Sequence, residues 1–183
     1  GGWRGASGWV AEPVGGCGTE VAAAQRRGRA WIGIDITHLS IAWRKYRLEA
    51  RFPGATYRVV GEPEDVGSAQ QLAHDDRYQF QWWACSLVNA RPYMGKKKGA
   101  DGGVDGLIFF EDDLSGTKKI VVSVKGGENV NVAMVRDLAH VIDREKAAIG
   151  LFVTLAEPTR PMKEEAISLG FYQTPTVGFE TPS

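Results

Sequence analysis

Apolar residues recur at helical spacing in the second half of the chain. Residues 77–89 are apolar and aromatic on one side, which predicts an amphipathic helix. Residues 130–146 predict a second helix, with Val135 and Leu138 on its apolar stripe. Pro161 suits the first position of a last helix, because its missing N–H has no partner there in any case. This half is therefore predicted to contain three helices.

The apolar runs between these helices predict strands. Residues 106–110 and 119–125 flank a turn over residues 112–116, and together they predict an antiparallel pair. Residues 149–155 are continuously apolar, which is typical of a strand buried on both faces. The order helix, strand, strand, helix, strand, helix predicts an α/β fold with a mixed sheet.

The first half follows a different pattern. A glycine turn precedes an Ala-rich helix over residues 20–27, and residues 30–35 predict a short buried strand. A helix is expected over residues 37–51, followed by a strand over residues 56–60. Residues 61–76 are polar and read as a linker with a short helix.

Composition adds few constraints. The 183 residues include 22 Lys and Arg and 22 Asp and Glu, so the net charge does not indicate a nucleic-acid partner. The two cysteines, Cys17 and Cys85, lie far apart, and the pattern of residues leads us to expect neither a signal peptide nor a membrane-spanning run. We therefore expect a reduced, cytoplasmic protein with no membrane partner.

The second block contains a group of residues that suits phosphodiester chemistry. Asp105 stands at the start of a strand, after a glycine-rich loop. In the next strand Ser123 and Lys125 point to one face, because side chains alternate along a strand. Hairpin pairing can bring them beside Asp105. The acid could hold Mg²⁺ or Mn²⁺, and the lysine could orient or deprotonate the attacking water.

At this point the sequence resembles a known family. Gly-Ala-Asp-Gly-Gly-Val-Asp-Gly followed by Val-Ser-Val-Lys looks like the PD-(D/E)xK restriction-endonuclease-like superfamily, and most like its Mrr-type branch. The resemblance implies an α-β-β-β-α-β core with a mixed central sheet flanked by helices. It also implies DNA as partner, a divalent metal as cofactor, and a homodimer as one arrangement in which such nucleases cut.

The resemblance assigns roles residue by residue. Asp105 becomes a metal ligand together with the Val124 carbonyl, and Lys125 becomes the catalytic lysine. Ser123 stands where the family places Asp, Glu or Gln, and Gln81 stands where relatives often carry Glu. Metal binding is then expected to be weaker, unless an acid at position 101, 111 or 128 contributes. Alternatively, the domain binds DNA with a decayed active site.

A basic, glycine-rich loop precedes Asp105. Lysines in such a loop are usually just solvated, but next to a phosphate site they can grip the DNA backbone. Glycines permit close approach of a bulky anionic duplex. The predicted DNA-contacting residues are Lys96, Lys97, Lys98, Gly102 and Gly103.

The first block suggests a nucleotide cofactor. Gly16 and Gly18 precede a helix, and Asp35 ends the next strand, where an acid can accept hydrogen bonds from ribose hydroxyls. These residues resemble the S-adenosylmethionine-binding segment of DNA amino-methyltransferases acting on adenine or cytosine. The family's catalytic Asn/Asp-Pro-Pro-Tyr/Trp motif is missing, and in this permuted class it would lie upstream of residue 1. Cofactor binding is therefore expected only if the methyltransferase half is completed.

Three units are expected on this basis. Residues 1–60 form a partial Rossmann-like β-α-β segment, residues 61–76 a linker, and residues 77–183 the restriction-endonuclease-like domain. The first hypothesis is a Mg²⁺-dependent DNA endonuclease of a restriction-modification type system. The alternatives are the C-terminal part of a methyltransferase and a DNA-binding module that no longer cuts.

Overall fold

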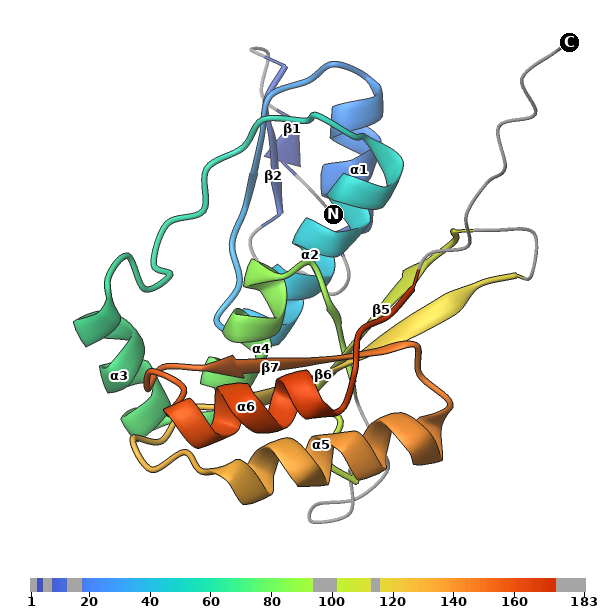
Figure 1. Ribbon diagram of the computed structural model, residues 1–183. Helices are drawn as coiled ribbons and strands as arrows, with labels where there is room; N and C mark the ends of the chain where they lie inside the picture. Colours follow the sequence, from blue (N-terminus) through green and yellow to red (C-terminus); the bar gives the residue numbers. More distant parts are fainter. Residues whose placement is uncertain (1–2, 5–7, 13–17, 94–101, 113–115, 174–183) are drawn as a thin grey trace, which may run out of the picture.

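The computed structural model describes residues 3–4, 8–12, 18–93, 102–112 and 116–173. They form two sheets with helices packed around them (Figure 1). In chain order, the elements of the first half are β1 (Trp3–Arg4), β2 (Val10–Glu12), α1 (Thr19–Arg26), β3 (Trp31–Gly33), α2 (His38–Arg51) and α3 (Val66–Asp75). Those of the second half are α4 (Arg77–Leu87), β4 (Arg91–Pro92), β5 (Gly106–Phe110), β6 (Lys118–Lys125), α5 (Val132–Glu145), β7 (Ile149–Thr154) and α6 (Arg160–Ser168).

The small first sheet has the order β1-β2-β3. Strands β2 and β3 pair in parallel with α1 between them, which is a β-α-β arrangement. The expected helices α1 and α2 are present, and Thr37 caps α2 by accepting a hydrogen bond from the Ser40 backbone N–H. That this segment belongs to a Rossmann-like fold remains a prediction.

Two expectations for the first half were wrong. Strand β3 is not buried, because it forms an edge of its sheet and leaves the Ile32 side chain 51% exposed. Residues 56–60 are not a strand, although Tyr57 and Val59 turn inward and their neighbours outward. This stretch has the period-two burial of a strand but pairs with none of the described strands.

Most of the polar stretch before the second block is helical. Asp65 and Ser68 form a reciprocal capping box that starts α3, and Asp76 caps α4 directly afterwards. The first block also contacts α4 across this stretch. Lys45 Nζ donates to Ser86 Oγ at 3.3 Å, and the His38 backbone N–H donates to Gln79 Oε1 at 2.7 Å. Helix α4 is thereby fixed from the side of α2.

The second sheet has the order β4-β5-β6-β7 and carries the candidate chemistry. Strands β4, β5 and β6 are antiparallel neighbours, whereas β6 and β7 are parallel. With α4 before the sheet and α5 between β6 and β7, the order is α-β-β-β-α-β, which is consistent with the expected restriction-endonuclease-like core.

Central strand β6 separates two apolar cores. Val122 and Val124 pack with Phe80 and Trp83 of α4, whereas Val121 packs with residues of α5. Helices α5 and α6 lie side by side along the sheet (Figure 1). Strand β7 contributes to both cores, but it is an edge strand and all six of its residues are only half-buried. The expectation of a fully buried β7 was therefore wrong.

Candidate active site

Asp105 is fixed at the mouth of the β5–β6 pair. Its backbone N–H donates to the Val122 carbonyl at 2.8 Å, and its own carbonyl accepts from the Tyr93 N–H at 2.9 Å. The carboxylate then turns to strand β6, where Oδ2 accepts from the Val124 N–H at 2.7 Å. The acid is thus attached by backbone and side chain to the strand that carries Lys125.

Gln81 of α4 completes this attachment. Its Nε2 donates to Asp105 Oδ1 at 3.0 Å, so each carboxylate oxygen accepts a hydrogen bond. The contact joins residues 24 positions apart. Gln81 is part-buried because α4 packs its aromatic side on the sheet. The structure thus brings two of the predicted site residues, Asp105 and Gln81, into direct contact.

Ser123 and Lys125 lie on either side of Val124. Because Val122 and Val124 face α4, alternation places Ser123 and Lys125 on the α5 face. Ser123 is only 4% exposed, so solvent barely reaches its hydroxyl. Lys125 is half-buried at the last position of β6. Of these two residues, Lys125 is the more accessible to a substrate.

The backbone next to Lys125 offers a further oxygen. The Lys125 carbonyl accepts from the Leu155 N–H at 3.4 Å, on the side of β7. Successive carbonyls of a strand point to opposite edges, so the Val124 carbonyl points to the edge where Asp105 lies. Carboxylate and carbonyl oxygens are the donors that Mg²⁺ takes, and it commonly fills its other positions with water and substrate phosphate. These residues therefore fit a divalent cation held by one carboxylate.

A second acid would have to come from elsewhere. Within the described ranges, no group of three or more His, Cys, Asp and Glu residues could hold a metal. Asp101 lies outside the described residues, and Glu111 follows the far end of β5. Glu128 lines a cavity of about 490 Å³ together with Gln81 and Lys125. Of the two acids at described positions, Glu128 is the one that shares a cavity wall with Gln81 and Lys125.

Cys85 of α4 contacts the backbone of Asp105, a role that was not predicted from the sequence. Its Sγ donates to the Asp105 carbonyl at 3.4 Å. A Cβ on the neighbouring Gly106 would lie 2.8 Å from this sulfur, which explains the glycine. Burial, and to a lesser extent the charge of Asp105, raises the pKa of the Cys85 thiol to about 12. The thiol is therefore a packing group and not a nucleophile.

The glycine-rich loop before Asp105 is described only at its end. Gly102 and Gly103 have φ angles of +60° and +81°, which other residues rarely adopt. Arg144 of α5 donates to the Gly102 carbonyl at 2.7 Å. This contact ties the end of the loop to the helix. The predicted lysines Lys96, Lys97 and Lys98 lie outside the described residues.

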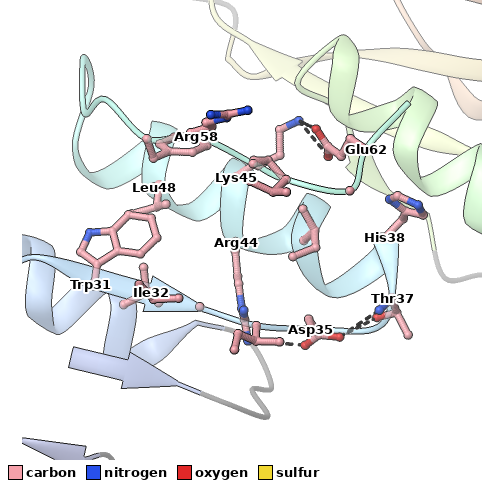
Figure 2. Close-up of a pocket in the computed structure, with 18 of the residues that line it drawn as sticks. Trp31, Ile32, Asp35, Thr37, His38, Arg44, Lys45, Leu48, Arg58 and Glu62 are labelled. Atoms are coloured by element: carbon pink, nitrogen blue, oxygen red, sulfur yellow. Dashed lines mark hydrogen bonds and ion pairs between the residues drawn. The ribbon is translucent and has the colours of Figure 1, made fainter. Parts of the chain in front are cut away.

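The predicted cofactor residues of the first block have protein partners. Asp35 accepts hydrogen bonds from the Thr37 N–H and hydroxyl and pairs with Arg44 at 3.4 Å, as Figure 2 shows. Arg44 is only 6% exposed. Gly18 is the N-cap of α1 and approaches the Arg44 side chain, whereas Gly16 lies outside the described residues. The pattern of residues did not predict this buried arginine.

A cavity of about 560 Å³ opens beside these groups. In Figure 2 it lies between β3 and the chain around Arg58 and Glu62. Lys45 and Glu62 form an ion pair at 3.2 Å on its wall. Burial is the largest influence on His38, another wall residue, and lowers its pKa. Whether this region binds S-adenosylmethionine remains a prediction.

The close approach of Gly18 to Arg44 has a measurable consequence. A Cβ at Gly18 would lie 2.7 Å from Arg44 Cγ, and φ is +71°. Gly28 has a similar φ of +61° but open space around it. We expect Gly18→Ala to lower the free energy of unfolding by about 1–3 kcal/mol more than Gly28→Ala, because only the first overpacks a buried group. Chemical denaturation of both variants measures the difference; equal losses would contradict this account.

The chain has a mixed α/β fold, with Asp105 directly before β5 and Lys125 at the end of the neighbouring strand β6. The family model Mrr_cat, described as restriction endonuclease, matches residues 74–170. The match covers more than half of the 183 residues, and the chain belongs to this restriction endonuclease family. No curated protein matches the chain, and no solved structure does. Among the described helices, none has the length and apolar character to cross a bilayer.

Proposed function

We propose that the chain is a divalent-metal-dependent DNA endonuclease of a restriction-modification type system. The support is the family match together with the arrangement around Asp105. The observation that carries the proposal is the 2.7 Å hydrogen bond between the Asp105 carboxylate and the Val124 N–H, directly before Lys125. This contact supports the proposal because it brings the carboxylate to the residue directly before Lys125.

Each residue has a chemical role in this proposal. Asp105 and the Val124 carbonyl would hold the cation. When bound, a divalent cation stabilises the negative charge that develops on the phosphoryl oxygens. Lys125 orients the attacking water as an ammonium group, or takes its proton when the amine is neutral. Gln81 holds the Asp105 carboxylate in position through the hydrogen bond from its amide.

Incubation with supercoiled plasmid tests the proposal. The protein is expected to nick the plasmid with Mg²⁺ or Mn²⁺ and to leave it intact in EDTA. Conversion of supercoiled to open-circular DNA on an agarose gel measures the reaction. Plasmid that stays supercoiled at every metal concentration would refute the proposed activity.

A second function is favoured by two specific observations. Ser123 is neutral and 4% exposed, and Gln81 offers an amide where a carboxylate would bind metal more strongly. These features suit a DNA-binding module that has lost cleavage. Such a module is expected to shift DNA on a gel at low salt, to release it at high salt, and to cut nothing.

An acid introduced at position 81 tests whether this side chain faces the proposed cation. Gln81→Glu would place a second carboxylate beside Asp105, so we expect Mn²⁺ affinity to rise about tenfold or more, since each further ligand charge strengthens binding of a hard cation. Calorimetric titration with Mn²⁺ measures the affinity, and Gln79→Glu, two residues away on α4, is the matched control. An unchanged affinity would mean that Gln81 does not face the cation.

A further inference from the structure

The cavity that Lys125 lines is large enough to hold a small molecule. Its volume is about 490 Å³, within the range of roughly 300–1,000 Å³ that is usual for small-molecule sites. It lies between the start of α4, the end of β6 and the start of α5. Its lining includes Phe80, Gln81, Lys125, Asn129, Val130 and Met134, together with Arg77.

The floor of this cavity is apolar and fixed. Phe80 is only 2% exposed, and Val130 and Met134 are half-buried. Gly126 closes one wall, where an added Cβ would lie 2.9 Å from Ala73 and from the Phe80 ring. The wall therefore sits directly on α3 and α4, and only glycine permits this approach.

The polar lining of the cavity carries charges of both signs. Lys125 and the exposed Arg77 contribute two cations, and Glu128 contributes one acid. The Arg77 guanidinium lies 5.0 Å from the centre of the Tyr78 ring. The amides of Gln81 and Asn129 are further polar groups of the wall. A DNA backbone could satisfy the cations, but it would leave the apolar floor uncovered.

A nucleotide matches both the apolar and the polar lining of the cavity. A single nucleotide has a flat, apolar base with polar edges and carries phosphates on either side. A base within a regular duplex is stacked and paired and cannot enter a pocket, so the nucleotide must be unpaired. We propose that this cavity receives an unpaired nucleotide next to the scissile phosphate, and that the substrate class is DNA with a bulge, mismatch or single-stranded end. The inference rests on the proposed function for the position of the scissile phosphate.

Binding to two matched DNAs tests this inference. Fluorescence anisotropy in EDTA compares a regular duplex with the same duplex carrying a one-nucleotide bulge. The wild-type protein is expected to bind the bulged DNA about 10–100-fold more tightly, because a base that is already unpaired saves the cost of extrusion. Equal affinity for the two DNAs would overturn the inference.

Cavity-filling variants locate the effect. Met134→Trp and Val130→Trp are each expected to abolish the preference while binding to regular duplex persists. Ile167→Trp is the control, because Ile167 is 60% exposed on α6 and is not part of the cavity. A preference that survives in folded Met134→Trp and Val130→Trp would assign it to another site. A further outcome is that the wild-type protein binds bulged DNA preferentially without cutting it, while Met134→Trp and Val130→Trp lose this preference. That result would refute the nuclease proposal and support the nucleotide site.

Discussion

Asp105→Asn is expected to abolish both DNA cleavage and binding of divalent cations while leaving the fold intact. The amide oxygen of Asn can still accept the hydrogen bond from the Val124 N–H, which is 2.7 Å from the carboxylate. The negative charge, however, is lost. Because a bound cation contributes several kcal/mol to phosphoryl-transfer catalysis, the cleavage rate should fall about 10³-fold or more. Plasmid nicking measures the rate, and calorimetry with Mn²⁺ measures binding.

Asp105→Ala separates the two roles of this residue. The alanine leaves the Val124 N–H without its acceptor, which is expected to cost about 1–3 kcal/mol of unfolding free energy. Asp105→Asn should cost much less, although both variants lose cleavage. Urea denaturation of the two proteins provides the comparison. Full cleavage by folded Asp105→Asn would remove Asp105 from the site.

The elements nearest this site are those that local pattern predicts best. Helix α5 has a clear apolar stripe, and Asn131 caps it by accepting from the Ala133 and Met134 N–H groups. The apolar stripe and the capping residue are both local features of the sequence. The predicted helix over residues 130–146 therefore differs from the observed one by only one or two residues at each end.

Predictions that depended on distant neighbours were less accurate. The apolar β3 and β7 were expected to be buried, but both are edge strands, so their burial depends on what lies beside them in space. Residues 56–60 have strand-like alternation, but they pair with none of the strands that the structure describes. Periodicity describes the side-chain pattern of a segment, and it does not identify the neighbour that completes a sheet.

In the site, too, features with a local signal were predicted and features that depend on distant contacts were not. Asp105 and Lys125 could be proposed from a glycine loop and strand alternation, because each signal is local. The contact of Gln81 with Asp105 spans 24 residues, and only the family resemblance pointed to that position. Arg44 and Cys85 gave no signal, since a buried arginine and a buried thiol are recognised by their surroundings. The site residues that were not predicted are therefore those whose roles depend on contacts between distant parts of the chain.

Lys125→Met is expected to lower the rate of plasmid nicking by about 10²–10⁴-fold, the usual contribution of a group that moves a proton in the transition state. Methionine keeps most of the apolar stem of this half-buried residue, so the fold should remain stable. DNA affinity should fall by only a few-fold, because at most one phosphate contact is lost.

Lys119→Met is the matched control for this change. Lys119 lies on the same strand and, by alternation, on the same face as Lys125, but it pairs with Glu145 at 3.3 Å near the far end of β6. We expect this variant to nick plasmid at close to the wild-type rate. If both variants nick equally well, the ammonium group of Lys125 does not act on the attacking water. If both lose activity together with DNA affinity, the loss reflects the charge of the whole strand, and Lys125 has no special role in the chemical step.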